Sequence, residues 1–250
     1  RDALLAEARR VGEIPFEVDA EPSTDGVARN AGGFRMAIPV QAADPTSPSS
    51  VALAAATRYR QLFGLDAPSK DLEFLDSRQD GVGGWHVHYR QRLESLPVFR
   101  GGLAVHLTPA LRLARFEAFT IPRDQVDTFA ATVSATSAEA TARLAVPIGV
   151  TVESATIILG IFAPEAVGFT GHGGVLSYRV TLETNPPDES RDVYVSATMG
   201  SVLHVTRLAA GFEPRYHIEE WGSPFPTPIF DTDGGTADPW IGTTHAAYRA

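Results

Sequence analysis

The hydrophobic pattern predicts one helix followed by several strands, and this order occurs twice along the chain. Apolar residues recur at helical spacing after Ser49 and Ser50, either of which can cap the helix, and the spacing ends at Phe63. Gly64 follows where a helix-terminating glycine belongs. Alternating apolar and polar residues then predict strands over 84–92, 103–107 and 111–120.

The same order returns in the second half of the chain. Thr136 and Glu139 have the spacing of a capping box, which predicts a helix that extends to about Leu144. Asn185 begins a Pro-rich turn, and Met199-Gly200 indicates a tight hairpin. Strands are predicted over 154–162, 176–184, 192–197 and 201–208, and short strands are predicted upstream of the first helix over 13–20 and 34–40.

These elements predict an α+β fold of two small domains, each a helix packed on a curved antiparallel sheet, with an extended C-terminal arm. The predicted boundaries are an N-terminal lead-in with strands over 1–48, a first domain over 49–122, a second domain over 133–208, and a Pro-rich arm over 209–250. The arm is rich in aromatic residues but has no evident core. It either docks onto a partner or folds back over the second domain, and both alternatives stay open.

Composition and charge narrow the classes of function. The 250 residues include 21 Lys+Arg and 30 Asp+Glu. The formal net charge of −9 argues against nucleic acid as a partner, because binding phosphates needs a basic footprint. The sequence contains no cysteine. No apolar stretch approaches the roughly 20 residues of a membrane helix, so we expect no membrane partner. The chain begins at Arg1 without a signal peptide, and we expect that a leader was removed or that the chain is part of a longer precursor.

No catalytic signature stands in the sequence, and we expect that this chain is not itself an enzyme. The HExxH motif of zinc peptidases is absent, since the nearest segment, which begins at His217, lacks a second histidine one turn later. The nucleophile elbow of hydrolases is also absent. The glycine cluster over 171–174 is not followed by a helical pattern, so it predicts a β-turn in place of a phosphate-binding loop. We assign no catalytic residue and no cofactor to the chain.

Three histidines form the one arrangement that could hold a metal. His86 and His88 lie on the same face of a predicted strand, and His106 joins them if the two neighbouring strands pair. Three imidazoles could hold zinc with an open position, which would make the chain a metal-dependent enzyme. We favour the alternative that they are hydrogen-bonded or solvated side chains on an outer face. No carboxylate stands at a spacing that would orient the rings, Glu94 being the only nearby candidate.

Four short motifs follow one another between residues 51 and 107. In this order they resemble the FTP domain, the fungalysin/thermolysin propeptide. Ser95 and Arg100 stand where that family usually has glycines, so we expect the turn geometry to differ there. The motifs are a Leu-Phe-Gly-Leu string ending at Leu65, a strand with His86, Val87, Tyr89 and Gln91, a string of Pro97, Val98 and Phe99, and a strand with Val105 and His106.

Residues 133–206 resemble the PepSY domain that follows FTP in such precursors. The resemblance lies in the helix near Ser137, in a strand over 176–180, and in a segment that contains Tyr194 and Gly200. Ser196 replaces the Asp that the family often has before its glycine. Each predicted domain, with one helix on a curved antiparallel sheet, is cystatin-like.

The resemblance implies that the chain is the N-terminal propeptide of a secreted, thermolysin-like zinc metalloprotease zymogen. Such propeptides act as chaperone and inhibitor of the catalytic domain, which is the expected partner, in cis. Zinc, with calcium as a further candidate, is expected in that partner. The strands that carry His86, His88 and His106, and the arm over 209–250, are expected to contact the catalytic domain. The residues that carry the family motifs or bind the partner are His86, Tyr89, Gln91, Pro97, Val98, Phe99, His106, Tyr194 and Gly200.

A second hypothesis stays open beside this one. A free-standing secreted FTP/PepSY protein would inhibit a protease or bind another protein without being part of its precursor. The two are separated by whether the gene continues past Ala250 into a domain with HExxH.

Overall fold

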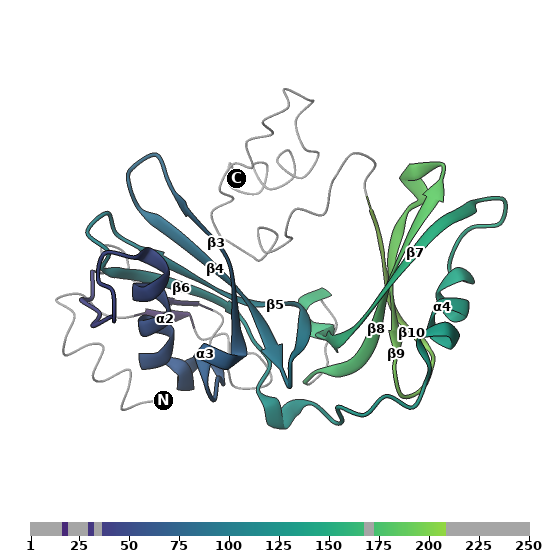
Figure 1. The fold of residues 1–250 in the computed structure, drawn as a ribbon, viewed down its shortest axis with the longest axis horizontal. Helices are drawn as coiled ribbons and strands as arrows, with labels where there is room; N and C mark the ends of the chain where they lie inside the picture. The colour runs from purple at the N-terminus through teal and green to yellow at the C-terminus, as the bar shows by residue number, and fades with distance from the viewer. Residues whose placement is uncertain (1–16, 20–29, 33–36, 168–172, 209–250) are drawn as a thin grey trace. The chain divides into compact units, whose positions relative to one another are not determined.

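The computed structural model describes residues 17–19, 30–32, 37–167 and 173–208 (Figure 1). They form a mixed α+β protein, as the hydrophobic pattern predicts. All of these residues belong to one compact unit. The predicted arm over 209–250 and most of the predicted lead-in lie outside the described residues.

Sheet A, the first group of strands, is antiparallel and runs in the order β1, β2, β6, β5, β4, β3. The sequence pattern does not predict β3, because this edge strand shows no alternation of buried and exposed positions. The bounds are β1 Glu17–Asp19, β2 Asn30–Gly32, β3 Leu72–Gln79, β4 Trp85–Leu93, β5 Leu96–Leu107 and β6 Leu113–Phe119.

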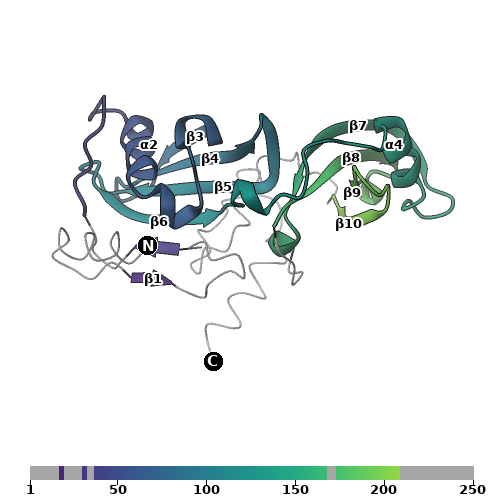
Figure 2. The same ribbon diagram turned by 90° about the horizontal axis from the view of Figure 1, so that it is seen from below.

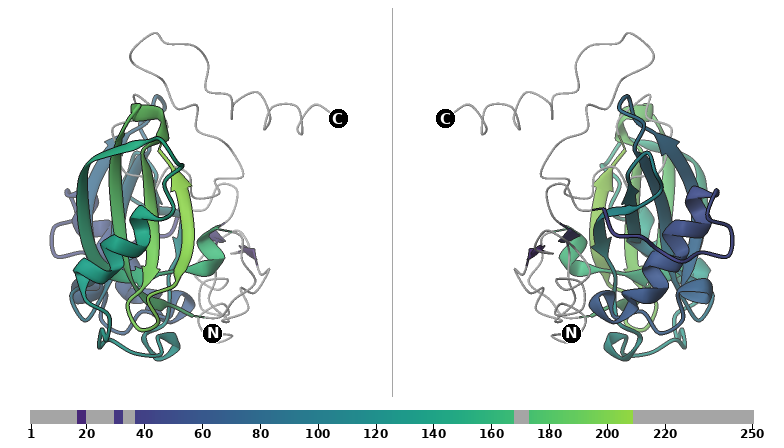
Figure 3. Two further views of the ribbon diagram at one scale, coloured as in Figure 1. Left: turned by 90° about the vertical axis from the view of Figure 1, so that its right-hand side faces the viewer. Right: turned by 90° about the vertical axis from the view of Figure 1, so that its left-hand side faces the viewer.

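Helix α2, Pro48–Arg58, covers one face of sheet A and is followed by the 3-10 helix η1, Arg60–Phe63 (Figure 3). The helix is capped by Ser47, whose hydroxyl accepts a hydrogen bond from the Ser50 amide, so the prediction of Ser49 or Ser50 as the cap is wrong. Pro48 lacks an amide hydrogen and fits the first helical position, which moves the start upstream. Gly64 ends the segment in the left-handed conformation, as predicted. A short helix, α3 Pro68–Asp71, leads into β3.

The core of sheet A lies between α2 and the strands. The ring of Phe116 on β6 packs against Tyr59 and Phe63, with ring centroids 5.8 Å and 4.9 Å apart. Alternate residues of β4 and β5, among them Val87, Leu103 and Val105, face this core and are fully buried. The opposite residues of the same strands therefore form the outer face of sheet A.

Sheet B is an antiparallel meander of four strands. Helix α4, Ala135–Arg143, lies across one of its faces (Figures 2 and 3). Ser134 caps this helix by accepting from the Ser137 amide, so the predicted capping box is wrong, and Glu139 pairs with Arg143 one turn later instead. The bounds are β7 Thr151–Phe162, β8 Val175–Asn185, β9 Arg191–Ser196 and β10 Val202–Arg207, with the 3-10 turns η2 Arg123–Gln125, η3 Pro164–Val167 and η4 Pro187–Glu189.

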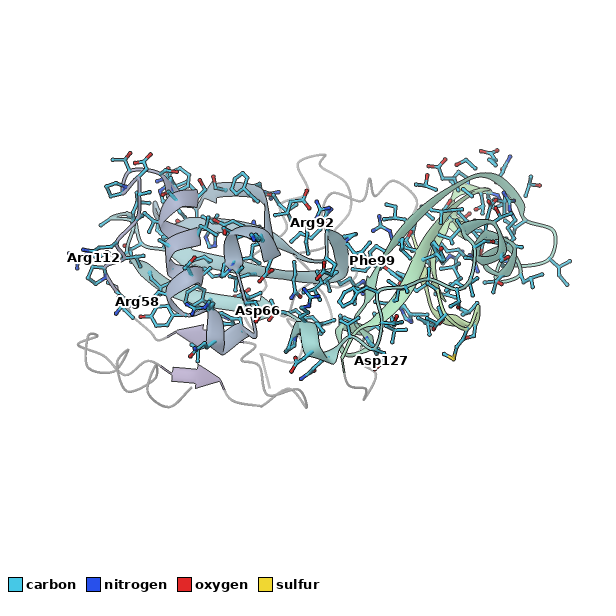
Figure 4. All side chains as sticks on the ribbon, turned by 60° about the horizontal axis from the view of Figure 1, so that its bottom comes forward. Arg58, Asp66, Arg92, Phe99, Arg112 and Asp127 are labelled. Atoms are coloured by element: carbon cyan, nitrogen blue, oxygen red, sulfur yellow. The ribbon has the colours of Figure 1, made fainter. Side chains whose placement is uncertain are left out.

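Strand β5 belongs to both sheets. Its residues Val98 and Phe99 pair in parallel with Ile161 and Phe162 of β7. The Phe99 ring, labelled in Figure 4, packs directly on Gly160, where a Cβ atom would lie 2.6 Å from the ring and 2.5 Å from the Pro97 carbonyl oxygen. Only glycine leaves room for this approach, and the two sheets are thereby joined through β5. Within the described residues, no helix has the length and apolar character needed to cross a membrane.

Candidate functional site

The outer face of sheet A gathers the polar side chains of three neighbouring strands. Strand β4 contributes His86 and His88, β5 contributes His106, and β6 contributes Arg115 and Glu117. We call this surface the histidine face. It lies opposite the α2 side of the sheet, so these side chains are not needed to fill the core.

Strand register places His86 directly opposite His106, and the two imidazoles bind each other. Their Nδ1 atoms are 2.6 Å apart, and the rings meet edge to face with centroids 4.7 Å apart. His86 Nε2 lies 3.1 Å from Asp80 Oδ2, and His106 Nε2 lies 3.5 Å from Glu117 Oε1. Polar groups therefore follow one another from Asp80 through the two imidazoles to Glu117, which Arg115 also contacts at 2.8 Å. The last contact is of ion-pair length only, since His106 Nε2 makes no hydrogen bond within the described residues.

Counting protons shows how many of them His86 and His106 can hold together. A hydrogen bond between two Nδ1 atoms requires one proton between them, so one nitrogen donates and the other accepts. If each Nε2 also keeps its hydrogen toward a carboxylate, the two rings hold three protons and share one positive charge. A fourth proton would break the Nδ1 hydrogen bond, because both nitrogens would then be donors. The two imidazoles can therefore hold at most three protons while the hydrogen bond between their Nδ1 atoms is kept.

The pKa values of the end groups follow from burial and charge. Burial lowers the pKa of His106, and the charges of His86 and Arg115 act in the same direction while Glu117 opposes them. Burial acts to raise the pKa of the Glu117 carboxyl, but His106 and Arg115 outweigh it and the pKa lies below its usual value. Asp80 behaves similarly, since His86 and the Val82 and Gly84 amides lower its pKa against the effect of burial.

His88 is separate from this pair. Its Nδ1 lies 2.7 Å from Asp76 Oδ1 on β3. The described residues contain no group of three His, Cys, Asp or Glu side chains arranged to hold a metal. The contact between His86 and His106 also leaves no room for zinc between their Nδ1 atoms, since Zn–N bonds are about 2.0–2.1 Å each. Nor does His86 resemble the histidine of a hydrolase triad, because its second nitrogen faces the imidazole of His106, where a triad has a nucleophile.

The prediction that no carboxylate orients these rings is wrong. Asp76, Asp80 and Glu117 each contact one of the three histidines. These carboxylates come from β3, from the β3–β4 turn and from β6, so they become neighbours only through strand pairing. Glu94, the candidate nearest in sequence, instead contacts Arg123. Spacing along one strand carries no information on partners in the next strand, and β3 itself is not predicted.

Tyr89 and Gln91, two further motif residues, have structural roles. Tyr89 faces the core of sheet A and donates a hydrogen bond from its hydroxyl to the Ser49 carbonyl, while burial raises the pKa of that hydroxyl. Gln91 is completely buried. Its amide donates to the Ile121 carbonyl at 2.7 Å and accepts from the Ile121 amide at 2.8 Å. These residues hold the fold and leave little of their surface for a partner.

The Pro97–Phe99 motif lies where β5 joins sheet B. Val98 is buried in the core beneath α4, whereas Phe99 packs on the opposite face of sheet B. There the ring of Phe99 lies 5.6 Å from that of Tyr194 on β9. Phe99 of the FTP-like motif thus contacts Tyr194 of the PepSY-like segment, which the sequence does not predict. Gly200 lies in the β9–β10 hairpin with φ of +72°.

Four non-glycine residues of the described part of the chain have positive φ, and two of them stand at the positions singled out for the FTP resemblance. Ser95 has φ of +68° and Arg100 has φ of +60°. We expected a different turn geometry at these positions because the FTP family usually has glycine there. Both residues instead adopt the left-handed conformation for which glycine is preferred.

Comparison with known proteins finds similarity among solved structures. No family model and no curated protein matches the chain. Among solved structures, the chain is similar to the Bacillus megaterium YpeB C-terminal domain, with 14% sequence identity and a TM-score of 0.34. The similarity covers 73% of this chain and 73% of that one. A TM-score of this size does not establish a shared fold, so the resemblance to FTP and PepSY rests on the sequence motifs.

Proposed function

We propose that this chain is the propeptide region of a secreted zinc metalloprotease, in which it assists folding of the catalytic domain and inhibits it until cleavage. The proposal starts from the ordered motifs over residues 51–107 and the looser resemblance over 133–206. It assigns the zinc and the chemistry to the partner domain. This chain contributes binding surfaces only.

One observation supports the proposal most directly. Phe99 from the FTP-like motif and Tyr194 from the PepSY-like segment pack together, and Phe162 lies 4.8 Å from the same tyrosine ring. The two resembling regions are therefore held as one body, with β5 shared between their sheets. A folding template has to present a fixed surface, and a rigid junction between its two halves provides one.

The physical basis of folding assistance is mass action. A chain that binds only the near-native catalytic domain stabilises that state relative to its unfolded state. Edge strands β3 and β10, each paired on one side only within the described residues, offer backbone groups for such binding. The histidine face offers ionisable side chains, among them His106, whose pKa burial lowers below its ordinary value.

Inhibition of the mature catalytic domain tests the proposal. We expect the chain to inhibit the HExxH domain encoded in the same precursor, and to inhibit an unrelated zinc peptidase much less. His88→Ala should weaken inhibition if the histidine face contacts the protease. The matched control is Gln79→Ala, an exposed residue at the end of β3 that pairs with the core-facing Trp85.

Two outcomes would change the assignment. Unaltered inhibition by His88→Ala, together with unaltered inhibition by His106→Ala, would remove the histidine face from the contact surface. Inhibition of a protease encoded elsewhere, with no HExxH domain in the same gene, would favour the free-standing inhibitor instead.

A further inference from the structure

The outer face of sheet B, opposite α4, carries a row of side chains of which the proposed function uses only Tyr194, for its contact with Phe99. Strand register aligns Ile158, Arg179, Tyr194 and His204 across β7, β8, β9 and β10. The guanidinium of Arg179 lies over the Phe99 ring at 5.3 Å from its centroid. This face is thus an aromatic surface with a positive charge resting on it.

Two arginines at this face lack the ion pairs that other strand arginines make. Arg100 and Arg179 have no carboxylate oxygen within 4.0 Å among the described residues. Within the described residues, Arg179 Nε is buried without a hydrogen-bond partner, and so is the Ser177 hydroxyl two residues earlier on the same face. Leaving buried donors unpaired is unfavourable. Paired arginines elsewhere in the sheets are Arg90, Arg92, Arg115, Arg191 and Arg207.

The backbone of Arg100 points to a use for its side chain. Its φ of +60° is a left-handed conformation that is unfavourable for a non-glycine residue. The conformation brings Arg100 Nη2 to 3.4 Å from the Thr206 hydroxyl on β10, a contact too long to be a strong hydrogen bond. Strained residues of this kind persist mostly where the side chain has a function.

Both arginines act on Tyr194, and Arg100 also acts on His204. Burial raises the pKa of the Tyr194 hydroxyl, Asp192 acts in the same direction, and Arg100 and Arg179 oppose it. Burial lowers the pKa of His204, and Arg100 lowers it further. Asp192, which accepts a hydrogen bond from the Thr181 hydroxyl at 2.5 Å, supplies the one negative charge of this cluster. Two guanidinium groups and one carboxylate leave a net charge of about +1, which suits a monoanion better than a phosphate dianion.

Strand β10, which lies beside this cluster, has an edge that can pair with an extended segment. Within the described residues it pairs only with β9, so its other edge has unpaired backbone groups. On the α4 side of the sheet, Val202 and Val205 are 42% and 38% exposed. A segment that added to this edge would place alternate side chains against these valines and toward Arg100.

We propose that β10 and the Arg100–Arg179 pair form a docking site for an extended polypeptide segment in which apolar residues flank a glutamate or aspartate. The segment pairs with the β10 edge, and its carboxylate accepts hydrogen bonds from the two guanidinium groups. Aromatic rings around the arginines exclude water and strengthen these bonds. The inference does not depend on the partner being a protease.

A peptide pair tests this site directly. The probe is a pentapeptide of threonine, valine, glutamate, valine and threonine, blocked at both ends, and its control replaces the glutamate with glutamine. In titrations followed by NMR, we expect the glutamate peptide to bind the full chain about tenfold more tightly, the size of one charge-assisted hydrogen bond. Arg179→Gln should abolish this preference, whereas Arg78→Gln, an exposed arginine on sheet A, should keep it.

A second variant separates binding from folding. Arg100→Gly relieves the left-handed backbone, so we expect a more stable protein that has nonetheless lost most of the preference for glutamate. Equal binding of the two peptides, or a full preference in both arginine variants, would overturn the proposal. Stronger competition by inorganic phosphate than by acetate would also overturn it, because the site would then select a different anion.

Discussion

At the scale of single residues, we expect the substitution of Gln91 to lower the stability of the protein. Its fully buried amide satisfies both the amide and the carbonyl of Ile121. Gln91→Met keeps the volume but leaves both backbone groups unpaired. We expect the free energy of unfolding to fall by about 2–5 kcal/mol in urea titrations, since each buried unpaired group costs about 1–3 kcal/mol.

The control for this change is Gln79→Met on the exposed end of β3. Its side-chain amide makes one exposed hydrogen bond, to the Gly83 carbonyl at 3.1 Å. A stability change under about 1 kcal/mol is expected there. Equal effects of the two substitutions would show that the Gln91 hydrogen bonds contribute nothing specific.

The histidines at the two outer faces should make stability depend on pH. The pKa of His106 and that of His204 lie below the ordinary value of 6.5, so near that pH the unfolded chain binds more protons than the folded one. Stability is then full above about pH 6.5 and falls as the pH drops below it. Glu117 and Asp80, whose pKa values are also lowered, add a further loss below about pH 4.5.

Denaturant titrations between pH 7.5 and pH 5.5 measure the first of these losses. The double substitution His106→Gln and His204→Gln should flatten the profile over this range, and each single substitution should remove part of the slope. An unchanged slope in the double variant would contradict the assignment of this titration to His106 and His204.

At the scale of elements, the junction of β5 with β7 depends on one glycine. Gly160→Ala places a Cβ atom against the Pro97 carbonyl oxygen and the Phe99 ring, and the carbonyl cannot move without breaking the pairing of the strands. We expect a loss of about 1–3 kcal/mol in stability. Thermal unfolding measures it, with Gly81→Ala as the control because nothing lies within 4 Å of a Cβ there. Equal melting temperatures for the two variants would contradict this account of the junction.

Most elements of the described residues could be predicted from the sequence, and the exceptions have physical reasons. Strands β4 and β6 to β10 follow from alternation, since each has one buried and one more polar face over much of its length. For β5 the pattern predicts only 103–107, because the first half of the strand is largely buried without alternation. Strand β3 could not be predicted, because an edge strand with little burial has no such pattern. The helix caps were misplaced because several serines and threonines stand near each start, and only the structure shows that Ser47 and Ser134 make the hydrogen bonds.

At the scale of the molecule, the candidate site was only half predictable. Local alternation placed His86, His88 and His106 on one outer face. Their carboxylate partners depend on the pairing of β3 and β6 with neighbouring strands, which joins residues 6 to 12 positions apart and leaves no local trace. The contact of Phe99 with Tyr194 was hidden for the same reason, since it depends on β5 reaching the second sheet.

The refolding yield of the catalytic domain tests the central claim most directly. The HExxH domain from the same precursor is denatured, diluted with or without this chain, and assayed after the chain has been removed. The account predicts a clear gain in active protease with this chain, and no gain with an unrelated acidic protein at the same concentration. An equal yield in the two cases would contradict the proposal that this chain is a folding template.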